Sequence, residues 1–296
     1  KLNQQTEPIS FLSIRPTYTE TENDLTVKAN KRTFIFSKKD GQLKGVSVDN
    51  RKISFANGPR FIGARRADRS LDQFYNHDDE KAKEKDRTYS EFPDAAVFTK
   101  LDVKQDGGDL IVTANYKLGN LDKAQWTISP SGDLVLDYTY NFSGVVDLMG
   151  ICFDYPEDQV ISKRWLGAGP YRVWQNRIHG TQYDVWENDY NDPIPGETFT
   201  YPEFKGYFGD VSWMNIRTKE GIISLTNETP NAYVGIYQPR DGRDRLLYTL
   251  PESGISLLNV IPPVRNKVNS TDLCGPSSQP KWVNGPQTGR IVFRFE

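Results

Sequence analysis

The sequence predicts an all-β fold in which antiparallel strands pack as a sandwich. Short runs of alternating apolar and polar side chains recur at intervals of roughly 8–12 residues. Gly, Pro, Asn or Asp separates most of these runs. The 296 residues contain no amphipathic pattern long enough for a helix of more than two turns, and no internal repeat. Because short strands with turn residues between them are typical of two packed sheets, we expect one large antiparallel sandwich.

The expected strands follow one another along the chain with turn signals between most of them. These signals include Lys39-Asp40-Gly41, Asp49-Asn50, Asn57-Gly58-Pro59, Asp106-Gly107-Gly108 and Ser131-Gly132. Alternation predicts strands at residues 25–29, 33–36, 43–48, 52–55, 60–64, 96–103, 110–118, 124–128, 134–142, 151–155, 161–166, 212–217, 222–227, 234–237, 245–249, 255–260 and 290–295.

Three parts of the chain differ in composition. Residues 1–22 are polar and contain Pro8 and Pro16, so we interpret them as a linker or the end of a preceding domain. Residues 65–92 have the least strand-like pattern and are expected to form a loop insertion. Residues 23–296 then form a single β domain. The chain starts at Lys1 without an initiator Met or an apolar signal region, and we expect it to be a piece of a longer protein.

Composition excludes several classes of function. The formal net charge is -2, so nothing favours nucleic acid or an anionic membrane as a partner. The sequence contains no run of 18 apolar residues and therefore predicts no membrane span. Metal-ligand clusters, phosphate-binding loops and serine nucleophile motifs are absent, so we expect no metal and no cofactor. Cys152 and Cys274 either form a disulfide or remain two buried thiols, and the sequence leaves both alternatives open.

The segment between Trp165 and Trp213 contains twelve aromatic residues, among them four of the six tryptophans. Arg, Asp, Glu and Asn lie between them, where a segment that only fills a core would carry Val, Ile and Leu. Amphipathic rings beside charged groups suit a surface that stacks on sugar rings and hydrogen-bonds hydroxyl groups. The alternative is that at least half of these rings are buried in the core.

Candidate carbohydrate-binding residues come mainly from this segment. Trp174, Trp186 and Trp282 are the candidates for stacking, and Trp282 follows a loop rich in Gly, Pro and Ser. Charged and polar candidates for hydroxyl binding are Arg177, His179, Asp184, Glu187 and Glu203. The alternative for each charged residue is a turn position or an ordinary surface charge.

The stretch Arg164-Trp165-Leu166-Gly167-Ala168-Gly169-Pro170, followed by Asn176-Arg177 and His179-Gly180, resembles the C-terminal small-chain domain of glycoside hydrolase family 2 β-galactosidases. That family carries a Trp-Leu-Gly-x-Gly-Pro stretch at this place. The run from Phe34 to Leu43 is similar to its first hairpin. We expect Gly167 and Gly169 to be structural, because they let the backbone turn tightly after a strand, where a side chain would clash or require a positive φ.

The resemblance implies a galactose-mutarotase-like supersandwich of two large twisted antiparallel sheets. It also implies that the catalytic glutamates lie on an upstream (β/α)8 barrel, against which the small-chain domain packs. In such enzymes a Trp near the C-terminus of this domain lines the sugar pocket, and Trp282 is the matching candidate. Tyr171-Arg172-Val173-Trp174 departs from the family's acidic-Asn-Tyr pattern. This departure predicts a relative that acts on another glycan.

The leading hypothesis is therefore a non-catalytic accessory domain of a periplasmic or extracellular glycoside hydrolase. Its partners would be carbohydrate and the upstream domains of the same protein. One alternative is a stand-alone aldose epimerase or polysaccharide lyase on the same sandwich. For the epimerase, the acid and base would be His77 or His179 with Glu187 or Glu203. Another alternative is a structural module whose aromatic segment forms an interface between domains.

Overall fold

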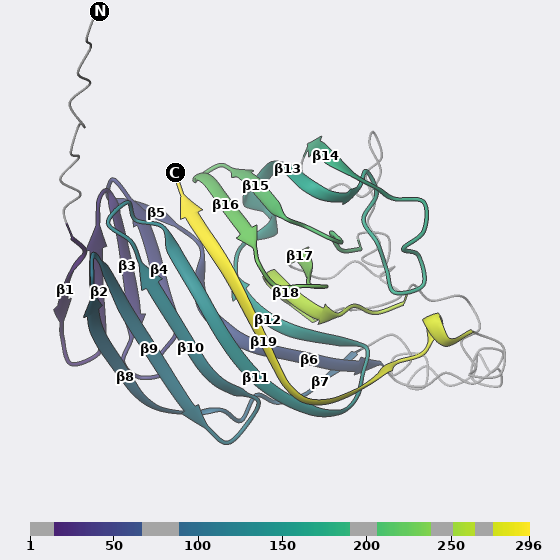
Figure 1. Ribbon diagram of the computed structural model, residues 1–296, viewed down its shortest axis with the longest axis horizontal. Coiled ribbons are helices and arrows are strands. Elements are labelled where there is room, and N and C mark those ends of the chain that lie inside the picture. The colour runs from purple at the N-terminus through teal and green to yellow at the C-terminus, as the bar shows by residue number, and fades with distance from the viewer. Residues whose placement is uncertain (1–14, 67–88, 190–205, 238–250, 264–274) are drawn as a thin grey trace, which may run out of the picture.

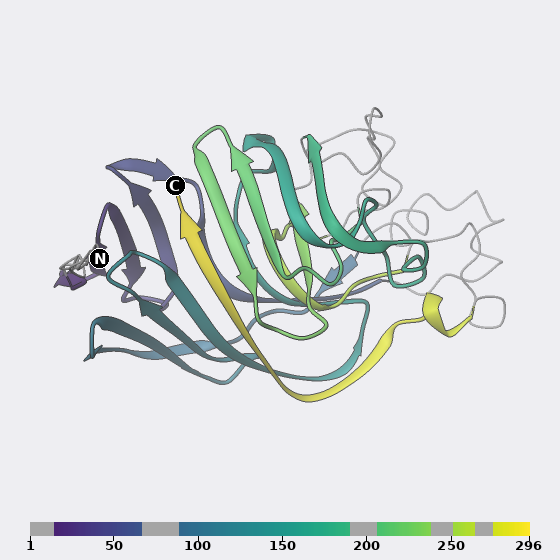
Figure 2. The same ribbon diagram turned by 45° about the horizontal axis from the view of Figure 1, so that its top comes forward.

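The computed structural model describes residues 15–66, 89–189, 206–237, 251–263 and 275–296. These residues form two antiparallel sheets of ten and nine strands that face each other (Figure 1). The second view shows the long strand β19 (Lys281–Phe295) crossing the molecule between β16 (Gly221–Asn227) and β11 (Leu134–Val146) (Figure 2). The predicted all-β antiparallel sandwich is confirmed.

The ten-stranded sheet has the order β1-β2-β3-β4-β6-β12-β18-β17, with β5 paired to β4 and β7 paired to β6. Its strands are β1 Thr17–Glu20, β2 Asp24–Ala29, β3 Arg32–Ser37, β4 Leu43–Val48, β5 Arg51–Ile53, β6 Ala56–Arg66, β7 Tyr89–Glu91, β12 Leu148–Asp154, β17 Tyr233–Tyr237 and β18 Gly254–Val260. The nine-stranded sheet has the order β14-β13-β15-β16-β19-β11-β10-β9-β8. Its remaining strands are β8 Val97–Asp106, β9 Asp109–Lys117, β10 Leu121–Ile128, β13 Val160–Gly169, β14 Gln182–Asp189 and β15 Trp213–Thr218. Two 3-10 turns, η1 Glu157–Gln159 and η3 Pro276–Ser278, precede β13 and β19.

Aromatic rings fill the core between the two sheets. Phe55 stacks on Phe153 with ring centroids 4.6 Å apart, and it meets Phe293 of β19 at 5.1 Å. Trp126 of β10 lies edge-on to Phe153 at 6.0 Å. All four rings are fully buried. Since burying such a side chain contributes about 1.5–3 kcal/mol, the cluster joins β12 of one sheet to β10 and β19 of the other.

Half of the ten-stranded sheet is buried on both faces. In β12, Met149 and Ile151 face the core between the sheets, whereas Leu148 and Cys152 join a second apolar cluster on the opposite face. Six of the seven residues of β12 are buried, so the strand appears in the sequence as a continuous apolar run. A one-sided strand would alternate instead. A further layer of chain must therefore cover this half of the sheet.

Most strands lie where alternation predicts them, but the antiparallel pair of β11 and β19 is longer than expected. The sequence predicts strands at 134–142 and 290–295, whereas the two strands pair continuously from Leu134↔Phe293 to Val146↔Lys281. Gly285, Pro286 and Gly289 interrupt the apolar pattern in the first half of β19. β14 was not predicted, because its side chains are mostly exposed. The strand predicted at 245–249 lies outside the described residues.

The expected domain borders differ from the structure at two points. Residues 17–20, within the expected linker 1–22, form strand β1, which pairs with β2 from Thr17↔Lys28 to Glu20↔Leu25. Residues 89–91, at the end of the expected insertion 65–92, form strand β7 along β6. Residues 67–88 lie outside the described part of the chain. The sheet therefore begins earlier than composition indicates, because the polar edge strand β1 buries no side chain.

Gly167 and Gly169 lie within β13, and neither has a positive φ. Close approach explains both. A Cβ on Gly167 would lie 2.9 Å from the carbonyl oxygen of Gly209, and a Cβ on Gly169 would overlap the indole ring of Trp186. The clash that we expected is therefore present, whereas the expected tight turn is wrong, because both glycines continue strand β13, and neither has a left-handed backbone.

Replacing Gly169 by Ala should lower the free energy of unfolding by about 1–3 kcal/mol, because the Trp186 ring has to move. Chemical denaturation monitored by circular dichroism measures this change. Gly45→Ala is the matched control, since Gly45 is also a buried strand glycine but a Cβ there meets nothing within 4 Å. Equal stability of the two variants would show that the Trp186 contact does not constrain position 169.

The thiol of Cys152 lies in the second cluster, where burial raises its pKa to about 11, even though the nearby Arg60 guanidinium acts in the opposite direction. An unfolded thiol has a pKa of about 8.5. The stabilising contribution of the protonated thiol is therefore complete below about pH 8.5 and is lost as the pH rises toward 11. We expect the free energy of unfolding to fall more steeply from pH 9 to pH 11 in the natural chain than in a Cys152→Ala variant. If urea titrations gave the same pH dependence of the free energy of unfolding for both chains, the raised pKa of the Cys152 thiol would be contradicted.

Candidate functional site

A tight turn at residues 174–177 organises one end of the sandwich. The Trp174 amide donates to the Arg177 carbonyl at 3.3 Å, and the Arg177 amide donates back at 2.8 Å. Just before this turn, Val173 pairs with Tyr207 through two backbone hydrogen bonds of 2.7 and 2.9 Å. The pairing aligns this segment beside a chain that is itself bridged to β17 through Phe208↔Val234. The turn is therefore fixed by the sheet next to it.

Gln175 connects this turn to the chain that enters β19. Its side chain is buried, and Nε2 donates to the carbonyl oxygens of Ser277 at 2.9 Å and Gln279 at 2.6 Å. Its backbone amide donates to the Pro262 carbonyl at 3.1 Å. The neighbouring Asn176 adds a hydrogen bond of 3.2 Å from Nδ2 to Ser278 Oγ. One buried amide thus donates to the carbonyl of Ser277 in η3 and to that of Gln279 directly after it.

Trp282 follows η3 at the start of β19 and is 71% exposed. It pairs with Val145 of β11. The next residue, Val283, packs against the core, so the Trp282 side chain lies on the outer face of the nine-stranded sheet. In both ribbon views η3 lies at the opposite end of the molecule from β1 and β2 (Figures 1 and 2). Trp282 thus presents an exposed indole directly after a turn that is held by side-chain hydrogen bonds.

The other two candidate stacking residues contribute to packing. Trp174 is 4% exposed and lies edge-on to Tyr207, with centroids 5.5 Å apart. It therefore belongs to the core and not to an open surface. Trp186 is partly buried, and its Nε1 donates to the carbonyl oxygens of Gly167 at 3.2 Å and Gln182 at 3.1 Å. The burial alternative thus applies to several rings of the aromatic segment: Trp165, Trp174, Tyr207 and Phe208.

The structure does not bring the polar candidates together. Asp184 and Glu187 are both exposed on β14, but side chains alternate along a strand. Asp184 therefore shares a face with Trp186, and Glu187 points to the other face. Arg177 and His179 are exposed in the chain that leads from the tight turn to β14. Glu203 and His77 lie outside the described residues.

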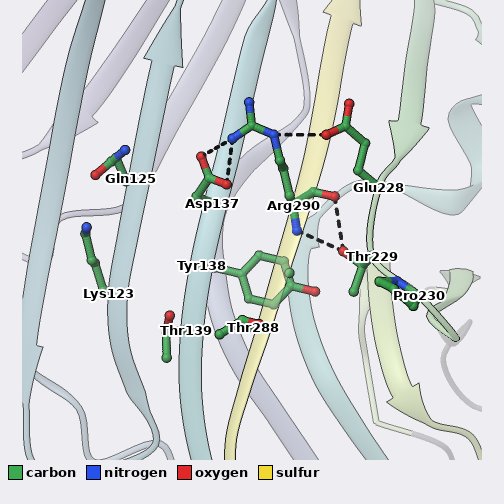
Figure 3. Close-up of a pocket in the computed structure, with 11 residues that line it drawn as sticks. Lys123, Gln125, Asp137, Tyr138, Thr139, Glu228, Thr229, Pro230, Thr288 and Arg290 are labelled. Atoms are coloured by element: carbon green, nitrogen blue, oxygen red, sulfur yellow. Dashed lines mark hydrogen bonds and ion pairs between the residues drawn. The ribbon is translucent and has the colours of Figure 1, made fainter.

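A hollow of about 370 Å³ lies on the outer face of the nine-stranded sheet (Figure 3). At its centre Arg290 of β19 donates to both carboxylate oxygens of Asp137 at 2.8 and 2.6 Å, and its Nε donates to Glu228 at 2.9 Å. Asp137 raises the pKa of Arg290. The remaining lining is mostly polar: Lys123, Gln125, Tyr138, Thr139, Thr229, Pro230, Thr288 and Gly289.

The charges in this hollow largely satisfy one another, and they tie β11 to the turn after β16. Thr229 reinforces the connection, because its hydroxyl accepts from the Arg290 amide at 2.8 Å and donates to the Arg290 carbonyl at 3.1 Å. The sequence did not point to this hollow. Its residues come from three strands and a turn far apart in the chain, and most of the strand residues have the pattern of ordinary outward-facing positions.

A cleft of about 490 Å³ opens beside the β3–β4 turn, and a neighbouring hollow of about 400 Å³ shares Lys39, Asp40 and Gln42 with it. None of the sequence-predicted site residues within the described part of the chain lines any of these three hollows. Among the described residues, no group of three or more His, Cys, Asp or Glu side chains is arranged to hold a metal ion. The same residues include no helix long and apolar enough to cross a membrane.

Two large antiparallel sheets with this topology define a galactose mutarotase-like sandwich. The model of the beta galactosidase small chain family matches residues 28–264, well over half of the sequence, and the chain belongs to that family. The resemblance inferred from Arg164–Pro170 is thereby confirmed.

Solved structures share the fold at low sequence identity. The galactose 1-epimerase from Lactobacillus acidophilus NCFM is 10% identical with a TM-score of 0.51, and the match covers 96% of this chain and 99% of the epimerase. A GalM/aldose epimerase homologue from C. elegans is 7% identical with a TM-score of 0.39, covering 95% and 99%. No curated protein sequence matches the chain. These likenesses concern the fold alone.

Replacing Gln175 by Leu should lower the free energy of unfolding by about 1–3 kcal/mol, because two carbonyl groups lose their donor. Amide hydrogen exchange in residues 276–283 should accelerate, since η3 loses its anchor. Gln125→Leu is the control, because Gln125 is a partly exposed strand residue with no side-chain hydrogen bond to the described residues. Unchanged exchange in the Gln175 variant would mean that η3 is held by other contacts.

Proposed function

We propose that this chain is the C-terminal accessory domain of a family 2 glycoside hydrolase, and that it completes the sugar pocket of an upstream catalytic barrel. The chain itself is non-catalytic, and its partners are carbohydrate and the upstream domains. The parent enzyme acts in the periplasm or outside the cell. Membership of the beta galactosidase small chain family supports this proposal.

The single observation that carries the proposal is the placement of Trp282. Its indole is 71% exposed, although its backbone belongs to a continuous strand ladder. Water exposure of so large a ring is unfavourable unless a partner covers it. A sugar ring bound between the barrel and this domain would cover the indole and stack on its face.

The contacts behind Trp282 suit such a role. Gln175 and Asn176 hold η3 through three side-chain hydrogen bonds, so the chain entering β19 is ordered before any ligand arrives. Preorganisation of this kind reduces the entropy lost on binding. The scaffold for the stacking residue is therefore provided by the 174–177 turn, whose first residue, Trp174, is buried in the core.

The test uses the full parent enzyme with Trp282→Ala. We expect KM for its glycoside substrate to rise about twofold to tenfold, because stacking on an aromatic face is lost. The melting temperature should stay unchanged, since the side chain is exposed. Trp282→Phe should retain most of the affinity. Tyr18→Ala is the control for removal of an exposed aromatic residue, because Tyr18 lies on edge strand β1 and is 47% exposed. Unaltered kinetics in Trp282→Ala would overturn the proposal.

The epimerase alternative is tested on the isolated chain. The shared fold is compatible with it, but the two described candidates, His179 and Glu187, are both exposed and line none of the hollows. We expect no acceleration of the optical rotation change of freshly dissolved galactose or glucose, and no release of nitrophenol from nitrophenyl glycosides. Acceleration that disappears in His179→Ala or His77→Ala would replace the accessory role by an enzymatic one.

A further inference from the structure

A gap in the ten-stranded sheet creates a cleft that has no part in the proposed accessory function. β4 and β6 are paired only at Leu43↔Gly58, whereas β3 and β4 are paired from Arg32↔Val48 to Phe36↔Leu43. Beyond Gly58 the chain of β6 separates from the β3–β4 turn. The cleft of about 490 Å³ lies between them and is closed from the side by the segment that leads into β8. Its volume lies within the range of about 300–1,000 Å³ that is typical of small-molecule sites.

Aromatic rings form a preformed apolar wall in this cleft. Phe98 lies edge-on to Tyr116 with centroids 5.9 Å apart, and Phe92 packs against Phe142 at 5.2 Å. The Phe98 ring also packs against Gly41, where a Cβ would come within 2.7 Å of the ring. Gly41 has a φ of 75°, so both its backbone and its lack of a side chain favour this arrangement. The rings are thus held in place from behind while they border the cleft.

Polar groups converge on the same space. The Tyr116 hydroxyl is buried and has no hydrogen-bond partner among the described residues. Burial and the charges of Asp40 and Asp94 raise its pKa, so it remains a protonated donor. One oxygen of Asp40 accepts from the Gln42 amide at 3.1 Å, and one oxygen of Asp94 accepts from the Ala96 amide at 3.1 Å. The second oxygen of each carboxylate accepts no hydrogen bond from the described residues and can serve a ligand.

The balance of charge restricts the ligand. Three carboxylates line the cleft, those of Asp40, Glu91 and Asp94, against the two cations Lys39 and Arg60. The Arg60 guanidinium is already paired with Asp154 at 2.6 Å, outside the lining. The cleft therefore carries an excess of negative charge that disfavours uronic acids and other anions. Fixed carboxylate acceptors, a phenol donor and aromatic faces suit the hydroxyl groups and the apolar faces of a neutral sugar ring.

We propose that this cleft is a second carbohydrate site, which binds one neutral pyranose residue of a glycan. The ring would stack on the exposed faces of Phe92 and Phe98, and its hydroxyl groups would bond with Tyr116, Asp40 and Asp94. Trp282 does not line the cleft, and binding there does not require an upstream barrel. The site would hold a glycan independently of the pocket that Trp282 completes.

Calorimetric titration of the 296-residue chain tests the site. The probes are methyl β-D-galactoside, methyl β-D-glucoside and methyl β-D-xyloside, with galacturonate and galactosamine as the anionic and cationic comparisons. We expect at least one neutral glycoside to bind and galacturonate not to bind. Tyr116→Phe should weaken binding about threefold to tenfold, because one hydrogen bond to the ligand is lost while the ring remains. Asp94→Asn should weaken it as well.

Two controls separate this site from the proposed function. Trp282→Ala tests which of the two sites the glycoside occupies, and Tyr18→Phe, a hydroxyl removal on an exposed edge strand, should leave binding by the isolated chain unchanged. Melting temperatures confirm that each variant is folded. Loss of binding in Trp282→Ala alone would assign the sugar to Trp282 and overturn the cleft proposal. Binding of galactosamine without any neutral glycoside would make the cleft a cation site, and no binding by any probe would also overturn the proposal.

Discussion

Burial of β6, β12 and β18 on both faces is the constraint from which the rest of this structure follows. One face is covered by the opposite sheet, but the other needs a second layer, to which the chain around Trp174 and Tyr207 contributes. This requirement fixes the segment before the 174–177 turn. Gln175, next in the chain, then reaches the carbonyls of η3 and sets the start of β19. The exposed Trp282 is thus positioned, through a few contacts, by the packing of a sheet that it does not touch.

Strand periodicity predicted the sandwich because most strands have one face in a core and one in water. It was less informative where this condition fails. β14 lies at a sheet edge with little burial, and β1 is fully exposed, so neither has an apolar repeat to detect. In β19, Gly289 makes room for the ring of Tyr138, its neighbour across the ladder. This packing requires a glycine, and a glycine interrupts the apolar pattern by which a strand is predicted. The first half of the 15-residue strand β19 was therefore missed.

The functional residues were harder to predict, because composition locates a segment and not the orientation of its rings. The aromatic segment is rich in tryptophan for two different reasons, burial of Trp174 and anchoring of Trp186, and neither reason requires a ligand. Trp282, outside that segment, is the exposed one. Adjacency in sequence also misled for Trp186 and Glu187, because consecutive residues of a strand face opposite sides. The cleft and the outer hollow combine residues from distant strands, and only the register of the sheets brings these together.

Each of the surfaces with a potential role lies where strand pairing stops. The cleft opens where β4 and β6 separate after a single paired position. The hollow around Arg290 lies where the β16–β19 ladder ends at Asn227↔Ile291 and the Thr229 side chain takes over the hydrogen bonding. Trp282 stands at the start of β19, where β11 is the only partner strand among the described residues. Two continuous sheets packed face to face leave little space between them. A sandwich of this kind therefore gains room for ligands by interrupting its ladders, and the interruptions indicate where binding residues should be sought.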